Sequence, residues 1–583
     1  MSGSTRTLPS VVGMVVVTVA VSFAFLSGWR PLTHDDVFFH LRGGELAVRE
    51  HVIPMKDTFS FTRSGTRWVT HEWGFGVLVY GAYELGDLGG MVVLQAVLCA
   101  VLAASALALA VLRNRDAAVA PVVAALAVVF GLSAAARHLS LRAMLVGSIF
   151  LAWELIALER FRITKRRRWL VILAGTFLVW SNVHAGVMFG LALAALAACE
   201  AAAAAVWGSK LGPFSLEHRD PGALGCVTAF GIVCVLLGPN GLEVLRYPME
   251  LNRFVFHSGL DLDLGLFAPA TPRNTPVFYA YLCLLLAGLV ARRHERPIGW
   301  FEIVSVAGFT MLAIRMHRFI LDETVVAAPL VTKLWVDRFT RTRWLDAFAA
   351  VLLVTAAAIA SRGVERRLLA PFFPESAAAF LESERLSGRL FHPQNFGGYL
   401  GWRLRRPIFW DGRDVEFASL SEEMARDGFA TVMDRYQVEV LLLTETEYAP
   451  IVGALTPDRW ALVYYDDDDA IYVRRTAVAT DWIDHRELKM FPPFGSTPGL
   501  RAMAESCERL AAARAELDRV LALHAGTKRA LFRQALLSFY AGDLARAQRE
   551  LVSILDAEYD PSVATALRAV MDARMRAGSA GHT

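Results

Sequence analysis

A short run of imidazole and carboxylate side chains, His34-Asp35-Asp36, follows the first apolar segment of the chain. If a helix begins near Asp36, His40 lies one turn further on, on the same helical face. A carboxylate and an imidazole at this spacing can share a proton, as general acid–base catalysis requires, or share a divalent metal ion. The alternative is structural, with Asp35 or Asp36 capping the free amides of a helix over residues 37–49. Both roles can hold together, because one carboxylate can cap while the other faces a cleft.

The elements that must position these side chains are mostly apolar. Of 583 residues, 55% are hydrophobic and 20% are charged, and the mean hydropathy is +0.41. This is more apolar mass than a soluble core can hide. The formal net charge of +3 gives no strong attraction to nucleic acid. The six cysteines form no CxxC pair, and the sequence has no Walker or G-x-S-x-G motif. The composition indicates a polytopic membrane protein and argues against a soluble kinase or hydrolase.

About eleven segments are apolar and long enough to be membrane-spanning helices. Residues 73–85 also carry helix signals, but they are too few for a span, so we expect them at the interface or folded back against the bundle. We interpret residues 11–26 as an uncleaved anchor, because no cleavage site follows. Glu154, Glu200 and Glu302 fall inside predicted spans and are interpreted as structural. The predicted spans are 11–26, 88–112, 117–136, 143–158, 169–183, 185–207, 223–238, 276–291, 297–314, 319–336 and 344–360.

The Lys and Arg residues of the short loops set the expected orientation. With the N-terminus in the cytoplasm, every dense basic cluster falls on the cytoplasmic side, and residues from 361 onward lie outside. Counting 73–85 as a span would move the basic run 165–168 to the outer side, which is the main reason to reject it. The cytoplasmic clusters are Arg113 with Arg115, 160–168, 292–296 and 338–343. The outer side then collects polar residues from many segments: 34–36, 71–73, Arg137, His138, Arg142, Asn182, His184, 238–241 and 315–318.

Several of these motifs together resemble the bacterial C-type (GT-C) membrane glycosyltransferase superfamily over roughly residues 11–336. The resemblance implies a polyprenyl-phosphate-linked sugar as donor and acidic catalytic residues in a first outer loop, here residues 28–69. His34 stands at the first position of the family's Asp-x-Asp pattern, and Asp36 matches the second. The motifs are HDDVFFHL at 34–41, Gly44, IP at 53–54, Asp57, FSFT at 59–62, Gly65, Trp68, HEW at 71–73, WSNVHAG at 180–186 and GPNG at 238–241.

The resemblance carries roles to individual positions. Asp36 is the first catalytic candidate and Asp35 the second, with His40 beside them, and the reaction needs a base for the acceptor hydroxyl that attacks the anomeric carbon. Cations would stabilise the departing lipid phosphate, which arginine forks suit. A divalent metal ion, Mg²⁺ or Mn²⁺, stays open. The candidate substrate-binding residues are His34, His71, Glu72, Arg137, Arg142, Asn182, His184, Arg315, His317 and Arg318.

Each of these substrate-binding candidates has a structural alternative. The arginines can anchor in the lipid headgroup region. His71 and Glu72 can orient the Asp36–His40 pair or cap a helix. Asn182 and His184 can line the same cleft or satisfy each other at a helix end.

The pattern changes from Pro374, where short strands and helices alternate as in an α/β domain. Residues 396–400 and 409–413 resemble the outer domain of many bacterial relatives. Asp411 and Arg413 could bind a ligand at a strand's end, or form a paired turn. Residues 466–469 are interpreted as a hairpin turn in preference to a calcium site. The expected strands are 389–392, 407–410, 438–443, 461–465 and 470–474, and the expected helices are 376–382 and 422–430.

The last part of the chain is Ala- and Arg-rich with helical spacing, and Phe539, 542–544, Ala547 and Pro561 resemble one tetratricopeptide repeat. One repeat does not make a stable stack, so we expect a helical hairpin docked on its neighbour, which could bind a protein partner. Residues 578–583 are expected to be disordered.

We therefore predict an α-helical polytopic membrane bundle with a C-terminal extracytoplasmic α/β domain and a helical hairpin tail. The predicted domains are 1–360, 361–480 and 481–583. The expected function is transfer of a sugar from a lipid-phosphate donor to a glycan, lipid or protein acceptor, outside the bacterial inner membrane. The alternatives are a transporter or flippase of a lipid-linked saccharide and a non-catalytic envelope scaffold. A transporter needs polar residues across the bilayer midplane, whereas this chain concentrates them at one face.

Overall fold

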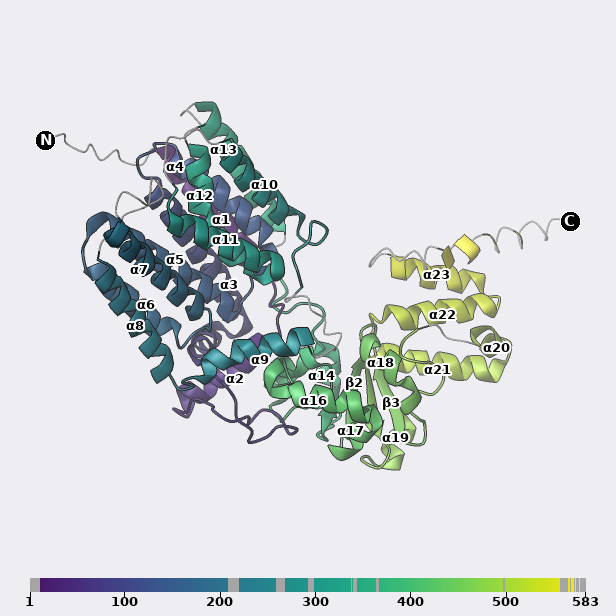
Figure 1. Ribbon diagram of the computed structural model, residues 1–583. Helices are drawn as coiled ribbons and strands as arrows, with labels where there is room; N and C mark the ends of the chain where they lie inside the picture. Colours follow the sequence, from purple (N-terminus) through teal and green to yellow (C-terminus); the bar gives the residue numbers. More distant parts are fainter. Residues whose placement is uncertain are drawn as a thin grey trace. The chain divides into compact units, whose positions relative to one another are not determined.

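The computed structural model describes residues 11–207, 220–257, 268–291, 298–336, 338, 343–362, 366–495, 499–555 and parts of 565–576. The chain divides into two compact units (Figure 1). Unit 1 comprises Met1–Asp57, Gly65–Ala370 and Asp414–Glu416. Unit 2 comprises Thr58–Ser64, Pro371–Arg413 and Phe417–Thr583. The boundaries predicted at 360 and 480 stay predictions.

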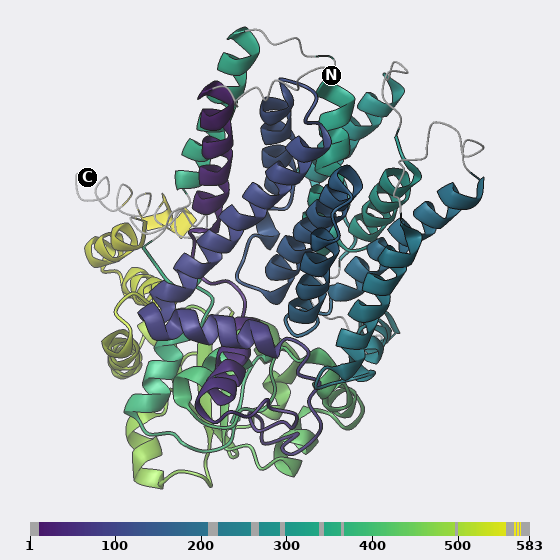
Figure 2. The same cartoon turned by 90° about the vertical axis from the view of Figure 1, so that its left-hand side faces the viewer.

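Unit 1 is a bundle of α-helices, and Figure 2 shows its long helices (purple to teal) side by side. Each of the predicted apolar segments coincides with a helix, because runs of apolar residues without Pro or Gly clusters favour continuous helix. The helices are α1 Val11–Gly28, α2 Asp36–Arg49, α3 Trp73–Arg113, α4 Ala120–Ala134, α5 Ala143–Thr164, α6 Arg168–Trp180, α7 Val187–Trp207, α8 Pro221–Leu237, α9 Glu243–His257, α10 Pro276–Val290, α11 Trp300–Arg315, α12 Ile320–Val336 and α13 Arg343–Arg362.

Within the described residues, α3 and α7 are long and apolar enough to cross a membrane by length and composition. Shorter apolar helices include α4, α6, α8 and α10. The number of spans therefore stays a prediction, as does the orientation. Residues 292–296 and 339–342 of the predicted basic clusters lie outside the described residues.

The predicted short piece at 73–85 is the first arm of α3. Gly86 and Asp87 break the helical geometry, with φ of −171° and +50°, so that α3 has two arms joined at a kink. The first arm packs on α2 through two glycines. A Cβ on Gly44 would lie 2.0 Å from the carbonyl oxygen of Gly76, and one on Gly76 would lie 2.7 Å from that of His40. This close backbone approach sets His40 on α2 beside the start of α3.

Sequence inspection gave no helix at α9, Glu243–His257. Its residues alternate between polar and apolar types and include Pro248. A search for long apolar runs passes over such an amphipathic segment. A second helix of this kind, α2, was expected because acidic residues mark its start.

Unit 2 contains a four-stranded sheet in the order β1-β2-β4-β3. Strands β1 and β2 are parallel, with Leu390 opposite Val440, while β4 is antiparallel to both β2 and β3. The strands are β1 Leu390–Phe391, β2 Val440–Thr444, β3 Trp460–Tyr465 and β4 Asp469–Arg474. The helices around them are α14 Glu375–Ser383, α15 Gly397–Leu404, α16 Asp414–Asp427, α17 Phe429–Arg435, α18 Glu445–Ile451 and α19 Thr480–Arg486.

The predicted strand at 407–410 is wrong. Ile408 forms an isolated parallel bridge with Ser60. The Ile408 amide donates to the Phe59 carbonyl oxygen at 2.9 Å, and the Ile408 carbonyl oxygen accepts from the Phe61 amide at 2.9 Å. The apolar pattern was real, but its partner comes from a loop some 350 positions earlier. The local apolar pattern therefore correctly indicated an extended segment, but this segment does not join the sheet.

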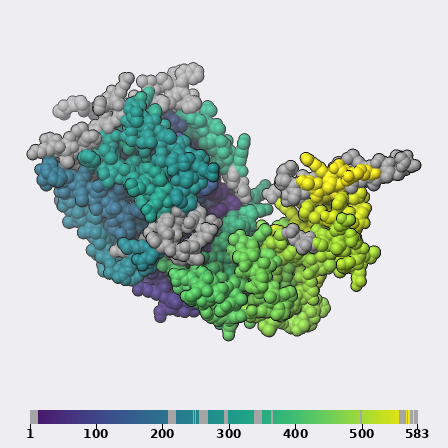
Figure 3. Space-filling view, turned by 45° about the vertical axis from the view of Figure 1, so that its right-hand side comes forward, coloured from purple at the N-terminus to yellow at the C-terminus, as the bar shows by residue number. Residues whose placement is uncertain are grey.

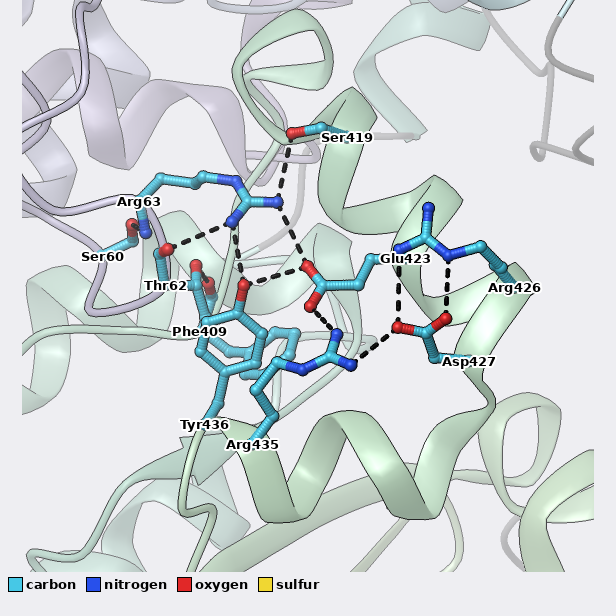
Figure 4. Close-up of polar contacts among 10 residues, drawn as sticks. All are labelled: Ser60, Thr62, Arg63, Phe409, Ser419, Glu423, Arg426, Asp427, Arg435 and Tyr436. Carbon is cyan, nitrogen blue, oxygen red and sulfur yellow. Dashed lines mark hydrogen bonds and ion pairs between the residues drawn. The ribbon is translucent and has the colours of Figure 1, made fainter.

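Arg63 fixes this early loop segment within unit 2 (Figure 4). Its guanidinium donates to the Tyr436 hydroxyl at 2.9 Å and to the Ser419 hydroxyl at 3.1 Å. It also lies 3.5 Å from the Glu423 carboxylate, which pairs in turn with Arg435. Residues 58–64 are thus part of the folded body of unit 2.

Asp411 and Arg413 form a buried pair in this unit. The Arg413 Nε and Nη2 atoms each donate to Asp411 oxygens at 2.7 Å, and both side chains are almost fully enclosed. Phe59 and Phe417 lie against the guanidinium. These contacts favour the paired-turn interpretation over a ligand site.

The four-aspartate run closes the β3–β4 hairpin. Asp466 Oδ1 accepts from the amides of Asp468 and Asp469 at 3.0 and 2.7 Å, which fixes the turn. Asp467 accepts from the amides of Lys528 and Arg529 at 2.8 Å, so it satisfies the first amides of a tail helix. The hairpin interpretation of 466–469 accounts for these contacts.

The tail contains α20 Leu500–Ala504, α21 Cys507–Leu523, α22 Lys528–Tyr540 and α23 Leu544–Leu555, drawn in yellow-green and yellow in Figure 3. Helices α22 and α23 pack on each other across a turn in which Gly542 has a φ of +82°. The tetratricopeptide resemblance is not confirmed, and Pro561 and residues 578–583 lie outside the described residues.

Candidate functional site

The loops at one end of unit 1 bring most of the predicted site residues together. These loops are the connections α1–α2, α2–α3, α4–α5, α6–α7 and α11–α12. Because consecutive helices of a bundle run in opposite directions, every second connection returns to the same end. Polar residues that are far apart in the sequence therefore meet there.

Asp36 pairs with Arg142. Asp36 is the first residue of α2, where the helix dipole favours a carboxylate. Arg142 precedes α5 in extended conformation. The Asp36 Oδ2 atom lies 2.5 Å from Arg142 Nη2, and the two side chains are 24% and 19% exposed. A ligand can therefore reach both groups.

Glu72 is surrounded by imidazoles. Its carboxylate oxygens lie 3.1 Å from His40 Nε2, 3.5 Å from His71 Nε2 and 3.7 Å from His184 Nε2. Burial favours a high pKa for Glu72, but His71 and His40 hold this pKa well below its usual range. Burial opposes the charge on His71 too, but Glu72 raises the pKa of that imidazole. We infer an ionised Glu72 that orients the imidazole of His40.

His184 presents its Nε2 atom to this carboxylate. The Gly186 amide donates to His184 Nδ1 at 3.1 Å, so the ring proton of a neutral His184 is on Nε2. Burial lowers the pKa of His184 to about 4, although Glu72 opposes this. His184 is therefore neutral near pH 7.

Two more histidines, His138 and His317, bridge the turns before α5 and α12. His138 Nε2 lies 3.1 Å from His317 Nδ1, and both side chains are buried. Burial, then His317 and Arg142, lower the pKa of His138 to about 3. This contact between the two imidazoles ties the turns together.

The positive charge of Arg142 lowers the pKa values of Arg318 and His34. Burial and then Arg142 lower the pKa of Arg318 to about 10, and the same two causes lower the pKa of His34 to about 4. Asp36 opposes both shifts. Glu72 and Asp322 also raise the pKa of Arg318. The loop end thus holds two guanidinium groups beside several carboxylates, and a guanidinium group can bind an anionic ligand.

Other predicted residues have different surroundings. Arg137 and Arg315 are exposed, and no hydrogen bond or ion pair recorded among the described residues joins either to Asp36. Asp35 is buried at the position before α2. Asn182 bonds the Trp73 indole at 3.0 Å and the Gly74 amide at 2.9 Å. Asn182 thus holds the start of α3, while its side-chain amide donates to the Leu178 carbonyl oxygen at 2.9 Å.

Sequence reasoning missed two residues that hold these loops. Arg30 donates to the carbonyl oxygens of Ala136 and Leu139 at 2.7 and 2.8 Å. Gln95 donates to Gly28 O and accepts from the Leu141 amide, both at 2.7 Å. The available signal was a lone amide side chain within the apolar run of α3.

Helix α9 also reaches the site. The Tyr247 ring lies 4.6 Å from the His71 imidazole, centroid to centroid. Arg67 in the first loop lies 3.8 Å from Glu243 at the start of the same helix. This helix therefore covers the imidazole side of the cluster.

The residues around Asp36 do not fit a metal site. Among the described residues, no group of three or more His, Cys, Asp or Glu side chains is arranged to hold a metal ion. Two cations act on Asp36: Arg142 pairs with it at 2.5 Å, and Arg318 interacts with it electrostatically. A divalent cation would meet charge repulsion there.

The fold is similar to that of known proteins. ArnT from Cupriavidus metallidurans in the apo state aligns with a TM-score of 0.51 and 14% identity, over 80% of this chain and 98% of ArnT. ArnT bound to undecaprenyl phosphate aligns over the same shares at 14% identity, with a TM-score of 0.47. Arabinofuranosyltransferase AftD from Mycobacteria aligns with a TM-score of 0.43 and 16% identity, over 80% of this chain and 42% of AftD. No protein-family model and no curated protein matches the sequence.

The likeness to apo ArnT concerns the fold. The chain therefore has a helical-bundle fold of the kind that the sequence motifs predicted.

Proposed function

We propose that this chain is a membrane glycosyltransferase that moves a sugar from a polyprenyl-phosphate-linked donor to an acceptor hydroxyl on the extracytoplasmic face. The observation that carries the proposal is the Asp36–Arg142 pair at the loop end of the bundle, 2.5 Å apart and partly exposed. It unites a proton acceptor and a phosphate-binding group in one place. The fold shared with apo ArnT supports it.

Asp36 acts as the base in this proposal. Its carboxylate accepts the proton of the acceptor hydroxyl while that oxygen bonds to the anomeric carbon. The bond from the anomeric carbon to the phosphate oxygen breaks, and its electron pair stays on the phosphate. Arg142 and Arg318 stabilise this charge as it develops. The products are the glycosylated acceptor, a protonated Asp36 and the free polyprenyl phosphate.

His40 and Glu72 position the reacting end of α2. His40 lies one turn after Asp36, and its imidazole is fixed by Glu72 at 3.1 Å. His71 and His184 hold Glu72 from other elements. We assign these groups to positioning, because the Glu72 carboxylate links the three imidazoles to one another.

The test is sugar transfer by the purified protein with a labelled polyprenyl-phosphate sugar. Asp36→Asn keeps the shape of the side chain and removes the base, so transfer is expected to fall by about 10²–10⁴-fold. Asp116→Asn is the matched control, because Asp116 is 84% exposed and follows α3 at the other end of the bundle. Unchanged transfer by Asp36→Asn would remove this residue from the mechanism. Absence of transfer by the unaltered protein would favour transport or scaffolding.

The orientation belongs to the proposal as well. Cys507 at the start of α21 is exposed in unit 2. With unit 2 outside, a membrane-impermeant maleimide added to intact cells labels Cys507, and Cys507→Ser abolishes that label. Labelling only after cell lysis would place unit 2 in the cytoplasm.

A further inference from the structure

Arg142 stands between two anions in the proposed reaction. We propose that it pairs with Asp36 before the donor binds and with the donor phosphate afterwards, so that donor binding releases the Asp36 carboxylate. This inference rests on the proposed function, whose donor it uses. It makes Arg142 a residue that couples donor binding to activation of the base.

The first support is the geometry of the pair. In the part of the chain that the structure describes, the recorded polar contact of both side chains is the one between Asp36 Oδ2 and Arg142 Nη2. A guanidinium offers five N–H donors, and this contact uses one. Arg142 therefore has donors left for a second anion.

The second support is where the two residues lie. They are 106 positions apart, one at the start of α2 and the other before α5. Their side chains are 24% and 19% exposed. A ligand can enter between them without opening a packed core, because neither is fully enclosed.

The third support is the surrounding charge. Arg142 contributes to the lowered pKa of Arg318, about 10, and of His34, about 4, in both cases after burial. His138, before α5, is shifted in the same direction to about 3. Arg142 and Arg318 thus place two guanidinium groups near Asp36, and a phosphate offers more charge and more acceptor oxygens than one carboxylate.

The exchange has a chemical consequence. An Asp36 oxygen engaged by a guanidinium has less lone-pair density for the proton of an acceptor hydroxyl. Once phosphate takes over Arg142, that oxygen is available, and the transfer described above proceeds. Donor therefore binds before acceptor. This order also limits proton abstraction when no donor is present.

The experiment measures binding without turnover. The probe is a synthetic polyprenyl monophosphate that carries no sugar, titrated into the full-length protein in nanodiscs. Asp36→Asn removes the competing anion and is expected to tighten binding about three- to tenfold, whereas Arg142→Gln weakens it. In the Arg142→Gln background the gain from Asp36→Asn is expected to vanish, which a double-mutant cycle detects. Asp116→Asn and the uncharged polyprenol serve as controls.

The outcomes separate this inference from the proposed function. Unchanged or weaker binding of the polyprenyl monophosphate by Asp36→Asn overturns the inference. A gain in affinity that persists in the Arg142→Gln background, or that also appears with polyprenol, overturns it as well. Asp36→Ser is a second neutral variant if the amide variant does not fold. A binding gain together with absent transfer by the unaltered protein would keep the exchange and reject the transferase. Sugar transfer by the unaltered protein without the binding gain in Asp36→Asn would keep the transferase and reject the exchange.

Discussion

The two ends of the unit 1 bundle both hold charged residues, in opposite arrangements. At one end Arg113, Arg162 and Lys333 each lie within 4 Å of Glu159 or Glu302, and the Lys333–Glu302 distance is 2.8 Å. At the other end, Glu72 is surrounded by imidazoles, and Asp36 pairs with Arg142. One end is neutralised locally, whereas the other keeps groups that can exchange partners.

The same helices carry both clusters. Helix α5 begins after Arg142, and Glu159 and Arg162 follow that residue by 17 and 20 positions. At 1.5 Å per residue, the helix separates the two clusters by about 26–30 Å. This is about the thickness of a bilayer core. Charged groups that are fully paired can hold helix ends together. Charged groups that can change partners mark a candidate site. The following variants test that distinction.

The largest effect on stability is expected from Glu302→Ala. Its side chain is nearly fully buried between Arg113 and Lys333, so the variant leaves cations without their carboxylate. We expect a loss of about 3–5 kcal/mol in the free energy of unfolding, measured by denaturation in detergent, and unchanged transfer per folded molecule. A stable variant would show that this end is not held by its ion pairs.

Glu72→Gln is expected to act on the reaction. The amide keeps the size of the side chain but removes the charge that orients His40 and His71. Transfer should fall about 10–100-fold with little change in the thermal midpoint, and the pH profile should shift because His71 loses the charge that raises its pKa. Loss of folding with normal transfer per folded molecule would assign Glu72 to structure.

Acid is expected to weaken the loop end selectively. His34, His138 and His184 have pKa values of about 4, 3 and 4, lowered first by burial. Unfolded histidines bind protons near pH 6.5, so the unfolded state gains protons first and stability falls as the pH drops from about 6.5 to 4. Thermal midpoints across this range measure the loss, and His138→Gln should reduce the slope. A pH-independent midpoint would contradict the buried, neutral histidines.

The smallest effect is expected from Arg162→Gln at the paired end. Arg162 lies 2.6 Å from Glu159 one turn earlier, but its side chain is 29% exposed. Partly exposed pairs of this kind contribute about 0.5 kcal/mol, visible as a small drop in the thermal midpoint. A loss as large as that of Glu302→Ala would mean that the whole network acts as one unit.

The sequence predicted the apolar helices well, because runs of Val, Leu, Ala and Phe are a strong local signal. It predicted α9 poorly, since the amphipathic residues 243–257 are neither apolar throughout nor marked by a clear start. The extension at Ile408 was recognised without its partner, Ser60. Distant pairing does not show in local composition.

The site was predicted in part. Asp36, His40, Glu72, Arg142 and His184 do meet, because alternate connections of a bundle share one end. Arg137 was chosen with its neighbour His138, but in that short turn His138 is buried and Arg137 is exposed. Which neighbour faces inward depends on packing that the sequence does not display.

The loop segment Thr58–Ser64 has a consequence for how unit 2 is made. Phe59, Phe61 and Arg63 supply contacts that Ile408, Arg389 and Tyr436 lack on their own. A fragment that starts at Pro371 would lack the part of the unit 2 interior that residues 58–64 supply. A synthetic peptide of residues 58–64 should restore these contacts. During synthesis, those residues leave the ribosome more than three hundred positions ahead of their partners, so the folding of unit 2 waits for the last third of the chain.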